Sequence, residues 1–225
     1  MKNNNEWINI SDMMAGLMMF FLFISIIYMM EVSNEKKNVK EIVVTYRKLQ
    51  KELNEKLNLE FKNDLTNWDA EILENNTIRF KSPDVLFETG ESEISDKFQN
   101  ILNNFFPRYL KIITEKQFEN EIDEVRVEGH TSSRWLSAET DDEKYINNIS
   151  LSQIRAKKVL EYCYLLDLTN ENKKWLTKVF RANGMAFAKL IFKDGFEDIE
   201  HSQRVEFRVI TKAEEKIFKI IDTLK

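Results

Sequence analysis

The sequence has 225 residues, 43% hydrophobic and 32% charged, which is enough for one well-packed domain plus an additional segment. Its formal net charge is −5, and basic residues are interleaved with acidic ones, which argues against a nucleic-acid-binding surface. The single cysteine, Cys163, excludes an intrachain disulfide and a metal site built on cysteines.

The first thirty residues contain the most apolar run of the sequence. Residues 13–30 carry no formal charge, and extension back to Ile8 gives about 23 residues, enough for a helix to cross a ~30 Å hydrocarbon layer. Asp12 lies inside this extended run. A carboxylate at membrane depth costs on the order of 3 kcal/mol, so such a residue is by default a candidate functional residue. We therefore predict a transmembrane helix within residues 1–32.

Three other interpretations of this segment remain open. A cleaved signal peptide would need a basic N-terminal region and a small-residue cleavage site, whereas the segment has one lysine, Lys2, and no A-x-A-like site before Glu31. A buried core helix would need more protein around it than this sequence offers. In the third interpretation Asp12 lies at the membrane interface beside Ser11 and caps the helix.

The orientation of the predicted membrane helix is contested by its flanking charges. Lys36, Lys37 and Lys40 follow the helix, and the positive-inside rule alone would place that side in the cytoplasm. Large folded domains are translocated largely regardless of flanking charge, however. We therefore expect the N-terminus on the cytoplasmic side and the C-terminal domain on the opposite side.

Residues 34–61 predict a helix that continues from the membrane segment. Its apolar positions alternate spacings of three and four residues through Val39, Ile42, Tyr46, Leu49 and Leu53, and Leu57 continues the stripe. Two heptads are fewer than the three or four that identify a coiled coil. Residues 33–67 are therefore assigned to a helical stalk or linker, either a parallel dimer stalk or an amphipathic helix docked on its own domain.

From Trp68 onward the pattern becomes mixed, so residues 68–225 are assigned to a soluble domain. The expected elements in chain order are a hairpin of residues 71–73 and 77–80 around Asn75 and Asn76, a helix over 96–118 that Pro107 kinks or divides, a strand over 125–128, a helix over 149–166, strands over 179–181 and 205–210, and a helix over 213–224. Strands that alternate with helices indicate an α+β fold with a mixed sheet and helices packed on one face.

Two separate parts of the sequence resemble one known family. Residues 11–22, SDMMAGLMMFFL, resemble the transmembrane helix of MotB-type stator subunits, and the resemblance implies that Asp12 carries the coupling ion. The soluble part resembles the OmpA/MotB peptidoglycan-binding domain over roughly residues 70–212. The matching pieces are Val85 to Phe87 with Gly90, VEGHT at 127–131, NISLSQIRA at 148–156 and QRVEF at 203–207. Residues 7–22 are most similar to ZorB, the family of MotB-like subunits of Zorya anti-phage defence systems.

The resemblance implies a peptidoglycan-binding site formed by the following residues: Arg155, Asn148, Leu151, Thr131, Ser132 and His130. Arg155 matches the arginine that takes a ligand carboxylate, and a guanidinium presents a planar fork of donors that fits a carboxylate. The family motif usually reads Gly-His-Thr-Asp, and its Asp helps to hold the amino group of the peptidoglycan diamino acid. Ser132 stands at that position here, and a nearby acid, such as Glu139 or Asp141, is a candidate replacement.

Each of these residues also has a structural interpretation. Arg155 is otherwise a surface arginine of a helix, and His130 a structural hydrogen-bonding group at a strand end. Asn148, placed just before the helix over 149–166, is otherwise a helix cap, and Leu151 a packing residue. The acidic residues of this region are most often part of a solvated loop: Glu139, Asp141, Asp142 and Glu143.

The resemblance also implies partners and a location. A homodimer of this chain would sit inside a ring of MotA/ZorA-like membrane subunits in the bacterial inner membrane, with the N-terminus cytoplasmic and the C-terminal domain anchored to peptidoglycan in the periplasm. Protons are the expected ion at Asp12, and sodium remains open because Ser11 and Ser25 offer oxygens. The alternatives are a flagellar or transport stator of the MotB, ExbD or TolR type and a peptidoglycan-anchored scaffold without transport.

We expect no enzymatic activity and no cofactor. The sequence contains no evident nucleophile–base pair, no glycine-rich phosphate loop and no metal-ligand spacing. With two histidines in the chain, a metal site is also not expected. Cys163 lies among apolar residues of a predicted helix and is expected in the core.

Overall fold

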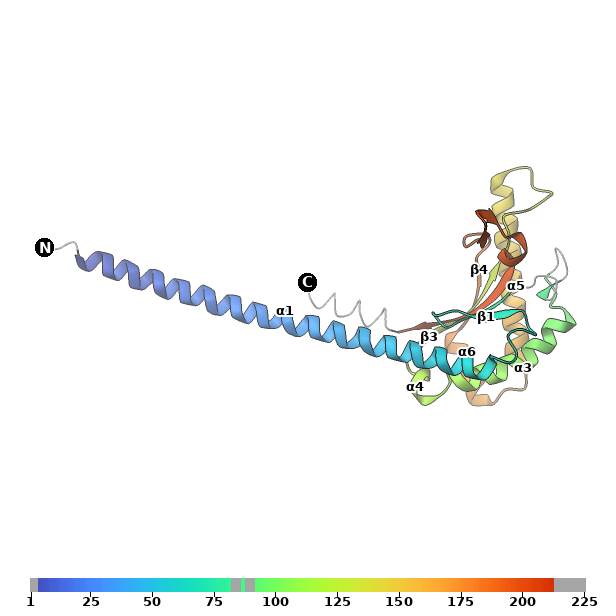
Figure 1. The fold of residues 1–225 in the computed structure, drawn as a ribbon, viewed down its shortest axis with the longest axis horizontal. Helices are drawn as coiled ribbons and strands as arrows, with labels where there is room; N and C mark the ends of the chain where they lie inside the picture. The colour runs from blue at the N-terminus through green and yellow to red at the C-terminus, as the bar shows by residue number, and fades with distance from the viewer. Residues whose placement is uncertain (1–3, 82–85, 88–91, 213–225) are drawn as a thin grey trace. The chain divides into compact units, whose positions relative to one another are not determined.

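A computed structural model describes residues 4–81, 86–87 and 92–212, and it divides the chain into two compact units (Figure 1). One unit contains the chain up to Tyr46, and the other comprises Arg47–Lys212. Helix α1 (Asn4–Phe61) contributes to both units. The helix expected over 213–224 and two of the motif positions, Val85 and Gly90, lie outside the described residues.

Helix α1 is apolar in its N-terminal part. Among the described residues it is the one helix that is long and apolar enough to cross a membrane. Neither glycine nor proline occurs between residues 31 and 61, so the predicted second helical segment continues from the first and ends at Phe61, as expected. Asp12 lies inside the helix, two turns after its start, and therefore does not cap it.

A five-stranded mixed sheet forms the centre of the second unit, as the sequence predicts. Its strands are β1 (Ala70–Ile72), β2 (Thr77–Phe80), β3 (Ile122–His130), β4 (Phe180–Gly184) and β7 (Arg204–Thr211). The strand order is β1-β2-β7-β3-β4, with β3–β4 parallel and the other pairs antiparallel. The expected hairpin of β1 and β2 turns at Asn76, whose φ of 61° lies in the left-handed region that asparagine tolerates.

The remaining described elements are helices and one small hairpin. They are α3 (Asp96–Ile113), α4 (Lys116–Glu119), α5 (Asp141–Leu165), α6 (Asn170–Val179), β5 (Phe192–Lys193), β6 (Phe196–Glu197) and α7 (Ile199–Ser202). Pro107 does not divide its helix, because it lies on the exposed side of α3, where water can hydrate the carbonyl that loses its partner. The break comes at Thr114, between α3 and α4.

Helices α3 and α5 cover the same face of the sheet. Phe207 of β7 faces Val127 of β3 in the sheet register, and its ring lies 5.0 Å from that of Phe105 in α3. Gly129, on the same face of β3, contacts the backbone of α5 at Ser152. Strand alternation therefore places the side chains at even-numbered positions of β3 and β7 on the opposite face.

The C-terminal end of α1 belongs to the core of the second unit. Leu53, Leu57 and Phe61 are buried at intervals of four residues, which places them on one side of the helix. The ring of Phe61 lies 5.3 Å from that of Phe105 and 5.8 Å from that of Trp68. The last turns of α1 are therefore packed on the domain that follows them.

Candidate functional site

Helix α5 begins eight residues before the predicted start. Thr140 is its N-cap, with Oγ1 accepting a hydrogen bond from the Glu143 backbone N–H at 3.1 Å, and the Glu143 carboxylate accepts from the Glu139 N–H at 3.0 Å. Asn148 therefore lies within the helix, and its interpretation as a cap is wrong. Asp141, Asp142 and Glu143 form the first turn, where the helix dipole favours negative charge, so the expected solvated loop is wrong for these three residues. Glu139 precedes the N-cap and lies in an exposed loop, as expected.

The side of α5 that faces the sheet carries polar residues at its first buried turns. Asn148, Ser152 and Arg155 are buried there, followed by Ala156, while Leu151 is half-buried. Three of the predicted site residues therefore share the middle of one helix. Their burial also shows that Arg155 is not a surface arginine, so that interpretation is wrong.

The end of strand β3 lies directly against this part of α5. A Cβ atom at Gly129 would stand 2.3 Å from the carbonyl oxygen of Ser152, so only glycine allows this approach. The Thr131 N–H donates a hydrogen bond to the Ala186 carbonyl at 2.9 Å, and the Ala186 N–H donates to Ser152 Oγ at 3.0 Å. The strand end, the helix and the segment after β4 are thus joined at Thr131.

The loop after β3 is fixed by an acid that sequence reasoning did not single out. Glu197 of β6 accepts hydrogen bonds from both the Ser133 backbone N–H, at 2.8 Å, and the Ser133 hydroxyl. Ser132, buried at 5% exposure, is the preceding residue. Of the two candidate replacement acids, Asp141 is the first residue of α5 and Glu139 lies just before the N-cap Thr140. Glu197 belongs to a hairpin too short to leave a clear periodic pattern.

Arg155 is a buried cation. Its guanidinium carbon lies 4.7 Å from the centroid of the Phe87 ring, a distance at which the ring face attracts positive charge. Burial lowers the pKa of Arg155 to about 10, and the side chain therefore stays protonated at neutral pH. Such a group offers a preformed positive charge to an anionic ligand.

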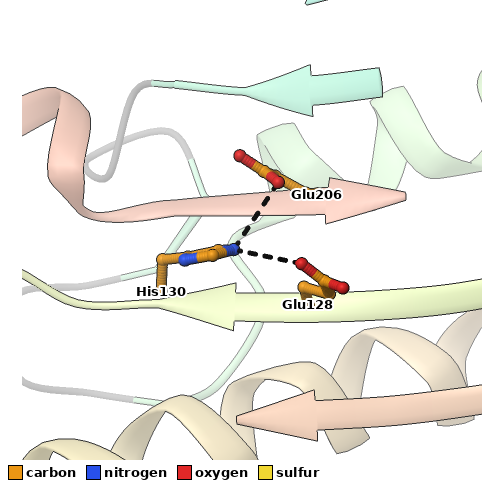
Figure 2. Close-up of side chains that lie close together, drawn as sticks. All are labelled: Glu128, His130 and Glu206. Carbon is orange, nitrogen blue, oxygen red and sulfur yellow. Dashed lines mark ion pairs between the residues drawn. The ribbon is translucent and has the colours of Figure 1, made fainter. Parts of the chain in front are cut away.

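His130 is separated from these residues. Strand alternation directs its side chain to the face of the sheet opposite α5, where Glu128 of β3 and Glu206 of β7 also lie (Figure 2). His130 Nε2 is 3.7 Å from Glu128 Oε2 and 3.6 Å from Glu206 Oε2. Of the predicted site residues, Thr131, Ser132, Asn148, Leu151 and Arg155 therefore belong to the junction of β3 and α5, whereas His130 belongs to a second buried cluster.

The chain is similar to known proteins over its soluble part and over nearly its whole length. A model of the OmpA family matches residues 86–204. The Zorya protein ZorB of Escherichia coli strain Crooks is 46% identical over 222 residues, which cover 98% of this chain and 94% of the relative. Among solved structures, the cell wall anchor of the T6SS from Pseudomonas aeruginosa matches with 18% identity and a TM-score of 0.48, over 69% of this chain and 96% of that one. A MotB-like protein from Desulfovibrio vulgaris matches with 18% identity and a TM-score of 0.47, over 79% and 98%.

Proposed function

The chain belongs to the family of the Zorya protein ZorB and carries an OmpA-family domain, and on this premise we propose that it is the MotB-like stator subunit of an ion-driven motor in Zorya anti-phage defence. The observation that carries the proposal is the 46% identity over 98% of the chain, which includes both the apolar helix and the soluble domain. The proposed organisation is a membrane segment over residues 1–32, a helical stalk or linker over 33–67 and a peptidoglycan-binding domain over 68–225.

The membrane part of the proposal concerns Asp12. We place α1 across the inner membrane with its N-terminus in the cytoplasm, and two copies inside a ring of MotA/ZorA-like subunits. The carboxyl group of Asp12 then takes up a proton from one side and releases it to the other, and each charge change alters the preferred contact with the ring. One elementary charge moved through ~100 mV supplies about 2.3 kcal/mol for each step.

The soluble part of the proposal is a grip on peptidoglycan at the junction of β3 and α5. Arg155 is the proposed partner of a ligand carboxylate, with Asn148, Leu151 and Thr131 around it. Position 132 holds a serine, and the Glu197 carboxylate bound to the next residue supplies a negative charge beside it. The anchor matters mechanically, because a stator that is not held would turn with the ring instead of transmitting torque.

Replacement of Arg155 tests the anchor. We expect Arg155→Ala to reduce the binding of the detergent-solubilised protein to purified peptidoglycan sacculi at least about tenfold. Alanine cannot donate the charge-assisted hydrogen bonds of the guanidinium, so the ligand carboxylate would be left to water. Arg155→Lys keeps the charge without the fork and should bind at an intermediate level. Arg126→Ala, a partly exposed arginine of β3 paired with Glu124, is the matched control.

The sacculus-binding assay can also contradict the proposed site. Circular dichroism and thermal unfolding of each variant show whether the domain is folded. Sacculus binding at the wild-type level by a folded Arg155→Ala protein would discard the site at this junction.

Replacement of Asp12 tests ion transport. Asp12→Asn keeps the shape of the side chain and removes its charge, so we expect phage protection to be lost while the complex with the neighbouring membrane protein still assembles. Glu31→Gln, at the end of the apolar run of the same helix, is the control and should protect normally. The measurements are plaque formation in cells that carry the full gene neighbourhood and co-purification of the two membrane proteins.

Other outcomes favour the alternatives. Retained protection by Asp12→Asn would indicate an anchoring scaffold that conducts no ions. Absence of protection by the wild type would instead favour a flagellar or transport stator of the same architecture.

A further inference from the structure

Two acidic side chains face each other across neighbouring strands in the buried cluster of His130, Glu128 and Glu206. Glu128 of β3 is the direct register partner of Glu206 of β7, and their side chains are 2% and 6% exposed. Like charges directly opposite each other destabilise a sheet, and the burial of an ionised carboxylate adds a large desolvation cost. The arrangement therefore requires positive charge between the two strands.

His130 points its ring between these two carboxylates (Figure 2). Its Nε2 atom lies 3.7 Å from Glu128 Oε2 and 3.6 Å from Glu206 Oε2, which is too long for a hydrogen bond to either. Within the described residues, neither ring nitrogen of His130 has a hydrogen-bond partner, and nor has Glu128 Oε2. Buried polar atoms nearly always have a partner, so these orphaned atoms indicate a ligand.

The separations fit a metal ion better than they fit direct bonds. The ligand atoms of the three side chains all lie within 4.8 Å of one another. Ligands at 2.0–2.2 Å from a tetrahedral zinc ion are about 3.3–3.6 Å apart, close to the two nitrogen–oxygen distances of the cluster. An imidazole together with carboxylates suits zinc and related transition metals, whereas calcium and magnesium prefer oxygen ligands alone.

The neighbouring arginine and lysine side chains leave Glu206 Oε2 and Glu128 Oε2 available to bind an ion. Arg204 Nε and Arg79 Nε donate to the other oxygen of Glu206, Oε1, at 2.6 and 2.8 Å. These two hydrogen bonds fix the carboxylate with its Oε2 turned towards His130, as outer partners of metal ligands commonly do. Arg208 lies 3.8 Å from Glu128 Oε1, and Lys189 lies 4.0 Å from Glu128 Oε2. Lys189 is half exposed and can turn into solvent when an ion binds.

We propose that Glu128 Oε2, His130 Nε2 and Glu206 Oε2 bind one Zn²⁺ ion, with water as the fourth ligand. The ion would tie β3 to β7 at the residues immediately before Thr131 and Ser132. This site is independent of the proposed peptidoglycan contact, since its side chains lie on the opposite face of the sheet from α5.

The test is a metal titration of the full-length protein in detergent. The protein is stripped with EDTA, dialysed, and titrated with Zn²⁺ by calorimetry and with Co²⁺ by visible absorption. We expect one ion per chain, a tetrahedral Co²⁺ spectrum that Zn²⁺ abolishes, and a higher thermal unfolding midpoint with Zn²⁺. Glu128→Gln and His130→Gln, which keep a polar side chain of similar size, should each bind Zn²⁺ at least about 100-fold more weakly.

The other histidine of the chain gives a matched control. His201 is 39% exposed and pairs with Asp198 at 2.7 Å, so His201→Gln should bind Zn²⁺ as the wild type does. Failure of the wild-type protein to bind Zn²⁺ would overturn the proposal and leave the arginines and Lys189 around the cluster as the positive charge that balances the two glutamates. Zn²⁺ binding at the wild-type affinity by both Glu128→Gln and His130→Gln would also overturn it, because the ion would then lie elsewhere. The Co²⁺ spectrum of the wild type decides the coordination even where a variant does not fold.

Discussion

Glu206 carries a full negative charge inside the domain because its neighbours hold it there. Burial by itself raises the pKa of Glu206, but attraction to His130 and Arg204, and hydrogen bonds from Arg204 and Arg79, outweigh burial and lower this pKa from 4.5 to about 2. For His130, burial has a larger effect on the pKa than the neighbouring charges have. Burial lowers the pKa of His130 below 6.5, and Glu128 and Glu206 offset this only in part. Both groups therefore resist protonation in the folded state.

Stability should consequently fall in acid. The unfolded chain takes up a proton at Glu206 near pH 4.5, whereas the folded protein does so only near pH 2, so about 3 kcal/mol of stability is present above pH 4.5 and is lost between these values. The unfolded chain also protonates His130 near pH 6.5, before the folded protein does, which lowers stability in the same direction from that pH downward. Urea unfolding of the metal-free protein at a series of pH values measures the slope.

A glutamine at position 206 isolates this contribution. Glu206→Gln should be less stable than the wild type at neutral pH, because Arg204 and Arg79 lose a charged partner, and its stability should change much less between pH 4.5 and 2. Glu128, Arg208 and Lys189 remain in both proteins. Glu161→Gln, an exposed carboxylate of α5 paired with Lys157, should keep the wild-type profile. An unchanged acid slope in Glu206→Gln would show that other groups govern acid unfolding.

Among the elements, those with a regular apolar pattern could be predicted from the sequence. Strand β7 alternates buried Val205, Phe207 and Val209 with charged residues, and its prediction is confirmed within one residue at either end. The hairpin of β1 and β2 follows from its turn residues. Helix α6 was missed because its ten residues bury only Leu176 and Val179, which is too few for a periodic signal.

The start of α5 was missed for a different reason. The apolar side chains near it, Tyr145 and Ile146, are largely exposed, while its buried positions hold polar residues such as Asn148 and Ser152. A search for apolar periodicity cannot find a helix whose buried side is polar. The spacing of Thr140 and Glu143 was the available signal, because a threonine followed three residues later by a glutamate is a capping box.

The two clusters of the domain differ in how far the sequence could reveal them. Apart from Ser132, which directly follows VEGHT, the residues of the junction between β3 and α5 come from two contiguous motifs, VEGHT and NISLSQIRA, so their association could be expected from the resemblance. The pairing of Glu128 with Glu206 depends on the register of strands that are far apart in the sequence. Nothing local to either motif fixes that register, and the buried cluster therefore required the structure.

At the scale of the whole molecule, α1 joins two units that differ in what surrounds them. Its apolar N-terminal part exposes large side chains along its length, as expected of a segment whose surroundings are lipid or other subunits. Its last turns are packed and paired on the soluble domain instead. Arg108 of α3 contacts Glu60 of α1 at 2.7 Å and Asp64 at 2.9 Å, and Lys56 contacts Glu115 at 2.7 Å.

The soluble domain should therefore depend on the end of α1 for its stability. A fragment that begins at Arg47 keeps the whole core and should fold, whereas one that begins at Trp68 loses three buried apolar side chains: Leu53, Leu57 and Phe61. At about 2 kcal/mol for each side chain, the loss is about 6 kcal/mol, comparable to the entire stability of a typical domain. Circular dichroism and thermal unfolding of the two fragments measure the difference.

Two substitutions in the full-length protein separate packing from mere helix length. Leu57 is fully buried, so Leu57→Ala should lower the free energy of unfolding by about 2–5 kcal/mol. Leu59 is 69% exposed on the same helix, so Leu59→Ala should lower it by less than about 0.5 kcal/mol. Equal stability of the two variants, together with equal unfolding midpoints of the two fragments, would show that α1 serves only as a spacer. The expected contrast would instead mean that the last turns of α1 are a structural part of the soluble domain, because their buried side chains complete its core.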